Sequence, residues 1–159
     1  MTEFDYAPTY MYHRPMFMVT VSVVLIVDNG VLVICKQKEP SVYAFPGGEV
    51  RAGQETIQFA AVRYVKEQTG ILLKKELIIP VDFRSDPSRS SSGNVMDLGF
   101  ACMINESDVE SNGIVVRKEV DFEDKKVISA NEDWSFYMDH GILLERAIDV
   151  ILMYKDVYP

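Results

Sequence analysis

Residues 47–71 read GGEVRAGQETIQFAAVRYVKEQTGI, and this stretch decides the fold that we expect. From Glu55 to Thr69 it contains no glycine or proline. Its apolar residues recur every three or four positions, which predicts an amphipathic helix that packs one face against a core. Gly70 stands where a helix commonly ends in a left-handed cap. The apolar face consists of Ile57, Ala60, Ala61, Tyr64 and Val65.

The segment before this helix predicts a hairpin followed by a turn. Met16 to Val27 is rich in Val, Ile and Thr, and Asp28-Asn29-Gly30 is a strong turn signal before a second apolar run, Val31 to Lys36. A charged loop ending in Pro40 follows, and Pro46-Gly47-Gly48 marks a place where the backbone turns and is exposed. We therefore expect two paired strands and then a loop that leads into the helix.

The rest of the chain predicts further strands and a closing helix. Apolar runs predict strands, and runs of Ser, Gly and Pro predict loops. The stretch from Glu106 to Glu123 is acidic and irregular. Strands on both sides of a helix, closed by a second helix, indicate an α/β or α+β sandwich. The expected elements are a strand at Leu77–Phe83, a polar loop at Asp86–Asn94, a strand at Val95–Ile104, a short strand at Ile114–Val116 and a helix at Asp139–Tyr154.

Length and composition limit the classes of function. We expect a single domain over the 159 residues, with its core at about 16–154. The net charge of −8, without clusters of Lys and Arg, argues against a nucleic acid polymer as partner. The longest apolar run, Met16 to Val27, is too short to span a membrane, so no membrane partner is expected. Cys35 and Cys102 lie in apolar runs as expected buried thiols, which favours a cytoplasmic location.

Residues 47–71 also resemble the Nudix box of MutT-like hydrolases, G-x5-E-x7-R-E-U-x-E-E-x-G-U with U apolar. Six residues separate Gly48 from Glu55 where the pattern has five, so one extra residue lies in the loop, where insertions cost little. Using Gln54 in place of Glu55 would put the arginine out of step by about 100° on the helix, and we reject that register. The residues that match are Gly47, Glu55, Arg63, Val65, Glu67, Gly70 and Ile71.

Segments outside the box resemble one branch of this family. Asp86-Pro87-Ser88-Arg89 and Asp139-His140 look like ADP-ribose pyrophosphatases and the Nudix-derived regulators of NAD metabolism. The resemblance implies a Nudix-type α/β/α sandwich around a mixed β-sheet and a nucleotide-diphosphate ligand, and it is compatible with a homodimer. Arg51, Arg84 and Arg89 are the candidate substrate-binding residues. A loop arginine such as Arg84 or Arg89 is alternatively just solvated.

The box implies metal chemistry, but this chain lacks two of the three glutamates that would bind the metal. Nudix enzymes use carboxylate-bound Mg²⁺ or Mn²⁺ to neutralise a diphosphate and to activate water. The three Glu of R-E-U-x-E-E share one helix face, and their positions here hold Tyr64, Glu67 and Gln68. The resemblance assigns Glu67 as the catalytic residue, and Glu67 with the Gly48 carbonyl as a weak metal site. Glu67 is equally well a surface residue paired with Arg63. The structural positions of the box are Gly47, Glu55, Arg63 and Gly70.

Several other residues are candidates for a role in the site. We expect His140, after Asp139, to cap and pack the second helix rather than to catalyse. An aromatic group near it either stacks on a base or covers the core, and we favour the core. These aromatic residues are Trp134, Phe136 and Tyr137, and the acids that could replace missing metal ligands are Asp97, Glu119, Asp121, Glu123 and Asp124.

Two functions follow from the resemblance. The first is a Nudix hydrolase that cleaves the diphosphate of an ADP-ribose-like substrate with Mg²⁺ or Mn²⁺, at weakened or altered activity. The alternative is a catalytically inactive Nudix-fold protein that binds and senses such a ligand. A third, weaker alternative is a structural subunit without a ligand. Fold analogy does not choose among them, because function depends on the site.

Overall fold

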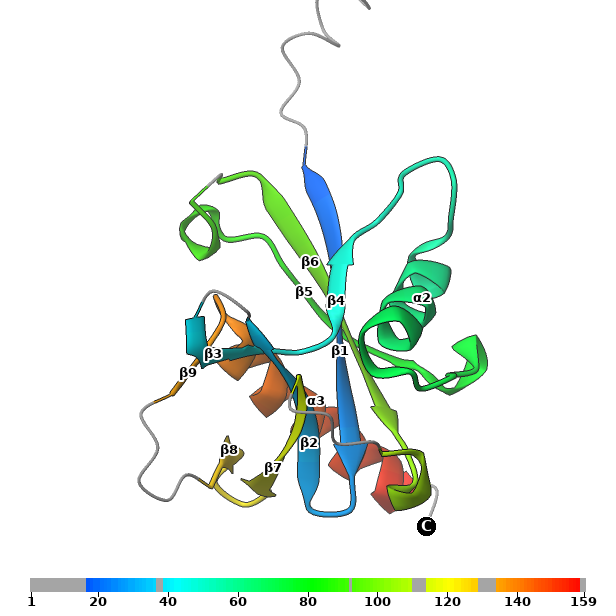
Figure 1. Ribbon diagram of the computed structural model, residues 1–159, viewed down its shortest axis with the longest axis vertical. Helices are drawn as coiled ribbons and strands as arrows, with labels where there is room; N and C mark the ends of the chain where they lie inside the picture. Colours follow the sequence, from blue (N-terminus) through cyan, green and yellow to red (C-terminus); the bar gives the residue numbers. More distant parts are fainter. Residues whose placement is uncertain (1–16, 37–38, 92, 110–113, 129–133, 158–159) are drawn as a thin grey trace, which may run out of the picture.

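The computed structural model describes residues 17–36, 39–91, 93–109, 114–128 and 134–157. Its strands form a mixed sheet that is flanked by two helices (Figure 1). The helices are α2 (Ile57–Thr69) and α3 (His140–Val157), with single 3₁₀ turns η1 (Lys75–Leu77), η2 (Pro87–Arg89) and η3 (Glu106–Asp108). The strands are β1 (Met18–Val27), β2 (Gly30–Lys36), β3 (Glu39–Ala44), β4 (Gly47–Glu49), β5 (Ile79–Arg84), β6 (Val95–Met103), β7 (Val115–Asp121), β8 (Lys126–Val127) and β9 (Ser135–Phe136).

Strand β1 organises the sheet. One edge of β1 pairs in parallel with β6 along nearly its whole length. Its other edge is divided, because β4 pairs antiparallel with the first half, Thr20 opposite Glu49, and β2 pairs with the second half, Leu25 opposite Leu32. The divided edge brings Gly47 and Gly48 opposite Ser22 and Val21, near the middle of β1. The bend at Pro46 and the two glycines that follow it at the start of β4 are called the Gly47-Gly48 turn below.

The two faces of the sheet carry separate cores, one under each helix. Side chains alternate between faces along a strand. Val21, Val23 and Leu25 accordingly pack with Ala60 and Val65 of α2. The intervening residues face the other way, where Val24 and Ile26 pack with Leu143, Ala147 and Ile148 of α3. The predicted α/β/α sandwich around a mixed sheet is therefore confirmed.

Both predicted helices are present, and the cap of α2 explains a shift at its start. The helix begins at Ile57 rather than Glu55, because the Thr56 hydroxyl accepts a hydrogen bond from the Phe59 N–H at 3.1 Å. Gly70 ends it with φ 78°, as predicted. In the part of the chain that the structure describes, neither helix is long and apolar enough to cross a membrane.

Two predictions of strand position were wrong in extent. The strand expected only at Ile114–Val116 runs as β7 to Asp121, because it pairs along β2 with Val31 opposite Lys118. The charged segment expected as a loop up to Pro40 contains the start of β3, which lies between β2 and β9. Both segments are polar in sequence, so their strand conformation depends on partners supplied by distant parts of the chain.

Candidate functional site

Two side chains of α2 hold the Gly-Gly turn. The amide of Gln68 accepts a hydrogen bond from the Gly47 N–H and donates one to the Gly47 carbonyl, both at 2.9 Å. The Tyr64 hydroxyl donates to the Glu49 carbonyl at 2.8 Å. A Cβ placed on Gly48 would overlap the Tyr64 ring, so this ring lies directly on the glycine backbone. Two of the three positions at which the box has carboxylates thus contact the turn with uncharged groups.

Glu55 and Arg63, two structural positions of the box, form an ion pair. The Arg63 Nε and Nη2 donate to the two carboxylate oxygens of Glu55 at 2.8 and 2.6 Å. Glu55 also accepts a hydrogen bond from the Arg51 N–H at 2.9 Å. This bond lies within the loop before α2, the loop that has one residue more than the box pattern. The hydrogen bond from Arg63 is the main reason that the pKa of Glu55 is lowered to about 2. This carboxylate is nearly buried, and both of its oxygens are paired within the protein.

Glu67 offers the remaining carboxylate of the box. Its side chain is 50% exposed, and it lies 3.4 Å from the Arg63 Nη1. Gly48, the other expected metal ligand, is paired with Val21 in the ladder between β4 and β1. No three His, Cys, Asp or Glu residues among those described are grouped so that they could hold a metal ion.

The alternative acids lie elsewhere in the fold. Asp97 contacts Thr20 and faces α3, on the opposite side of the sheet from Glu67. Asp121 accepts hydrogen bonds from the Glu123 and Asp124 N–H groups at 2.9 and 3.0 Å and so closes the β7–β8 turn. Figure 1 shows this turn across the molecule from α2. Glu119 is exposed on β7 near the same end.

A cavity of about 290 Å³ opens on the α3 face of the sheet, beside the Gly47-Gly48 turn. This volume is at the lower end of the range for small-molecule sites. Thioethers and aromatic rings form part of its wall, and a group of polar side chains forms the rest. The apolar part includes Met18, Phe45 and Met138, and the polar part includes Thr20, Ser22, Arg89, Asp97 and His140.

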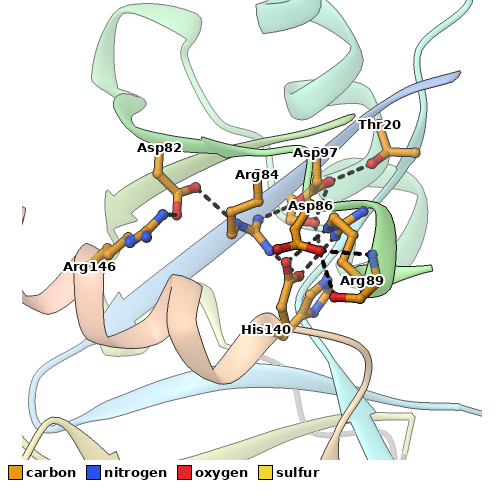
Figure 2. Close-up of polar contacts among 11 residues, drawn as sticks. Thr20, Asp82, Arg84, Asp86, Arg89, Asp97, His140 and Arg146 are labelled. Atoms are coloured by element: carbon orange, nitrogen blue, oxygen red, sulfur yellow. Dashed lines mark hydrogen bonds and ion pairs between the residues drawn. The ribbon is translucent and has the colours of Figure 1, made fainter. Parts of the chain in front are cut away.

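A buried ion network lies behind the polar wall of this cavity. Arg84 is 6% exposed and donates to Asp82, Asp97 and Asp139, so its guanidinium ties β5 and β6 to the start of α3 (Figure 2). Asp82 also binds Arg146 of α3 at 2.9 Å. Arg84 is therefore neither solvated nor among the residues that line the cavity. Its role in the structure is to hold three carboxylates in place.

Arg89 is the candidate arginine that does line the cavity. Its Nε and Nη2 donate to the two oxygens of Asp139, both at 2.9 Å. The side chain is 4% exposed, and its Nη1 has no hydrogen-bond acceptor among the described residues. Arg51 differs, since it is exposed in the loop before α2 and does not line the cavity.

His140 forms part of the cavity wall as a neutral ring. Its Nδ1 accepts the Phe45 N–H at 3.0 Å, and its Nε2 lies 3.4 Å from the Ser22 hydroxyl oxygen. Burial lowers the pKa of His140 to about 4. Because Nδ1 is an acceptor in the neutral ring, Nε2 carries the proton and points it at Ser22. The packing role expected for His140 is present, with its ring stacked on Phe45.

Most of this chain matches one known domain family. The NUDIX domain model covers residues 16–134. This chain belongs to the Nudix family. Tyr64, Gln68 and the Gly47-Gly48 segment that they contact, referred to below as the Nudix loop, all lie within the matched residues.

Relatives within the family add to this assignment. An ADP-ribose pyrophosphatase of Methanocaldococcus jannaschii is 37% identical over 75 residues, which are 46% of this chain and 43% of that protein, less than half of its length. A solved MutT/nudix family protein of Enterococcus faecalis matches this chain with a TM-score of 0.70 at 19% sequence identity. The match covers 96% of this chain and 70% of the Enterococcus chain.

A third relative has been solved with a ligand. This relative is the NUDIX domain of Shewanella oneidensis NrtR, complexed with ADP ribose. It matches this chain with a TM-score of 0.67 at 19% sequence identity, and the match covers 95% of this chain and 99% of the NrtR domain. NrtR has also been solved in complex with a 27mer DNA, and the match covers 63% of that NrtR chain. At these identities the solved structures share the Nudix fold with this chain, and the likeness goes no further.

Sequence reasoning missed most of the polar wall of the Nudix cavity. Thr20 and Ser22 interrupt an apolar strand two positions apart, so they share a face, and this was the signal that could have found them. Their partner Asp97 was predicted only as a metal ligand. Tyr137 lines the cavity, whereas Trp134 and Phe136 pack against the α3 core.

Proposed function

We propose that this Nudix domain binds an ADP-ribose-like nucleoside diphosphate and does not hydrolyse it through the box. The single observation that carries the proposal is the contact of Gln68 and Tyr64 with the Gly47–Glu49 backbone. In a hydrolase of this family, the same positions would supply carboxylates for a metal. Here they stabilise the turn with neutral hydrogen bonds, so the loop keeps its shape without a cation.

The donor set supports this reading. Hard divalent cations require several oxygen ligands, with charge from carboxylates. Glu67 is the one carboxylate left at the three positions, and Arg63 lies next to it. The Gln68 oxygen is occupied by the Gly47 N–H, and Tyr64 donates its proton to Glu49. These residues do not fit a carboxylate-bound Mg²⁺ or Mn²⁺, and we derive no hydrolytic step from them.

The class of ligand is supported by the cavity and by the relatives. The cavity adjoins the Nudix loop and combines apolar walls with a few polar groups, as small-molecule sites generally do. One relative is named an ADP-ribose pyrophosphatase, and another was solved with ADP ribose. Three earlier expectations stay predictions. They are a homodimeric assembly, a cytoplasmic location, and that no nucleic acid polymer is a partner.

Hydrolysis is the second candidate function. The 37% identity to an ADP-ribose pyrophosphatase over 75 residues favours it, as does the exposed carboxylate of Glu67. Mg²⁺ can bind through one or two protein carboxylates when the substrate adds phosphate oxygens. In this alternative, Glu67 and the bound diphosphate would hold one ion, with slow turnover.

One experiment separates the two functions. The purified protein is incubated with ADP-ribose in Mg²⁺, in Mn²⁺ and in excess chelator, while products and melting temperature are both measured. We expect ADP-ribose to raise Tm equally in all three solutions, without AMP or ribose phosphate appearing. Metal-dependent turnover that Glu67→Gln abolishes would overturn the proposal in favour of the hydrolase. No rise in Tm and no turnover would reject both.

A further inference from the structure

The Arg84 side chain joins three carboxylates that come from different parts of the fold. Its guanidinium donates through Nε to Asp82 of β5, through Nη1 to Asp139 before α3 and through Nη2 to Asp97 of β6. The side chain is buried. A buried charge is tolerated when it is paired and hydrogen-bonded, and here all three arms of the guanidinium are engaged. Arg84 therefore fixes where each of these carboxylates lies.

Asp97 connects Arg84 to two hydroxyl groups of β1. Its Oδ2 accepts from Arg84, while its Oδ1 accepts from Thr20 at 2.6 Å and from Ser22 at 3.0 Å. Thr20 and Asp97 are direct partners in the parallel pairing of β1 with β6. Figure 2 shows Asp97 between Arg84 and Thr20. Because Arg84 holds Oδ2, the other oxygen is turned toward the hydroxyls.

The bond to Asp97 decides which hydrogen bonds these hydroxyls can make with a ligand. A hydroxyl has one proton and two lone pairs. Thr20 and Ser22 each donate that proton to the carboxylate, so toward a ligand they can only accept. Both residues line the cavity, but Ser22 is buried beside the His140 ring, whereas Thr20 is partly exposed. Thr20 is therefore the acceptor that a ligand reaches more easily.

We propose that Arg84 is a positioning residue for ligand binding, which acts through Asp97 on the Thr20 hydroxyl. The guanidinium holds the carboxylate, the carboxylate takes the hydroxyl proton, and the hydroxyl then accepts a hydrogen bond from the ligand. The cavity accordingly selects a ligand that presents a donor, such as a hydroxyl or an amino group, to Thr20. Arg84 acts at a distance, because it is buried and is not among the residues that line the cavity. The inference rests on the proposed function, since it needs a ligand in this cavity.

A double-mutant cycle separates this role from a merely structural one. Calorimetry measures the affinity for ADP-ribose of the native protein, Thr20→Val, Arg84→Lys and the double variant. Valine keeps the branched shape of threonine but cannot accept a hydrogen bond, so Thr20→Val should weaken binding about tenfold. Arg84→Lys keeps the charge, but one ammonium cannot replace the three arms of the guanidinium, and binding should again weaken about tenfold. In the Thr20→Val background, Arg84→Lys should weaken binding less than about twofold, because the hydroxyl on which it acts is already gone.

Two further variants test whether the effect passes through the hydroxyl. Thr20→Ser restores a hydroxyl at this position, so both the native affinity, within about twofold, and the sensitivity to Arg84→Lys should return. Arg146→Lys is the matched control, since Arg146 joins the same network through Asp82 but is half exposed and does not line the cavity. It should leave the affinity for ADP-ribose unchanged in every background.

Asp97→Asn gives the same cycle without changing the arginine, which keeps the inference testable if Arg84→Lys does not fold. Arg84 only donates, so the oxygen of the new amide must face it and the NH₂ group must face Thr20. The Thr20 hydroxyl then accepts from the amide and turns its proton to the cavity, where it opposes the donor of the ligand. Asp97→Asn should weaken ADP-ribose binding about tenfold in the native background and less than about twofold in the Thr20→Val background.

The outcomes distinguish this inference from the proposed function. If the native protein binds ADP-ribose but Arg84→Lys or Asp97→Asn, when folded, weakens binding equally with and without the Thr20 hydroxyl, the role is structural. The positioning role is then wrong and the proposed function stands. Native affinity in Thr20→Val also overturns the positioning role alone. If the native protein does not bind ADP-ribose, both proposals fail.

Discussion

The Gln68 side chain forms a two-point amide pair with Gly47, accepting from its N–H and donating to its carbonyl at 2.9 Å each. Such a pair requires both an oxygen and an NH₂ group, so glutamine can make it and a carboxylate cannot. A glutamate at this position would place its charge against the Gly47 carbonyl. The substitution from the family pattern is therefore matched to the loop and is more than a lost ligand.

Restoring the two carboxylates should create a metal site. In the double variant Tyr64→Glu/Gln68→Glu, three glutamates at positions 64, 67 and 68 share one face of α2. We expect a lower Tm than the native protein in chelator, because the loop loses the two hydrogen bonds that Tyr64 and Gln68 donate, and a rise in Tm on adding Mn²⁺. Thermal melts with and without Mn²⁺ measure this. Adding Glu67→Gln should weaken the metal response. Equal Mn²⁺ stabilisation of the native protein would contradict the prediction.

The two glycines of the turn should differ in their response to alanine. At Gly48 the obstacle is the Tyr64 side chain, whereas at Gly47 it is the Val21 backbone. We expect Gly48→Ala to cost about 1–3 kcal/mol, as overpacking generally does, and Gly47→Ala to cost more. The Gly48 penalty should shrink in a Tyr64→Ala background, while the Gly47 penalty should not. Denaturant unfolding of the six proteins, the native protein included, gives these values. Unchanged Gly48 penalties in both backgrounds would count against the contact with Tyr64.

The local elements of the fold were accessible from the sequence. The hairpin turn at Asp28–Gly30 and the helix ending at Gly70 both depend on residues close together in the chain. Each has a short-range physical cause, such as turn chemistry or helical spacing. These local elements of the Nudix scaffold could therefore be predicted from the sequence.

The polar wall of the cavity could not be predicted in the same way. Thr20 and Asp97 are 77 positions apart, and they meet because β1 and β6 pair in parallel in one register. The contact of Arg84 with Asp139 likewise joins residues 55 positions apart. Nothing local specifies such registers. Burial of each face decides them, since a shift by one residue would turn every side chain to the other face.

The Glu55–Arg63 pair should make the domain sensitive to strong acid. The folded pKa of Glu55 is lowered to about 2 by the Arg63 hydrogen bond, so its contribution is complete above the ordinary value of 4.5 and is lost as pH falls from there toward 2. Glu55→Gln should lower Tm at pH 7 and show a smaller further loss over that window. Glu67→Gln, at the exposed contact of the same arginine, should change stability by less than about 0.5 kcal/mol. A steeper acid loss in Glu55→Gln than in the native protein would refute the assignment.

His140 should produce a second loss of stability at a higher pH. Its folded pKa is lowered from 6.5 to about 4 because the ring is buried, and a proton on Nδ1 would meet the Phe45 N–H, which Nδ1 now accepts. Below pH 6.5 the unfolded chain therefore binds a proton that the folded one does not, so stability falls between pH 6.5 and 4, by a few kcal/mol in total. His140→Gln cannot titrate, and although it is less stable at pH 7, its free energy of unfolding should be flatter across this window. Denaturant unfolding at half-unit pH steps measures both slopes. The comparison cancels groups that lie away from His140, such as Glu55, so equal slopes in the two proteins would show that His140 is not the group responsible.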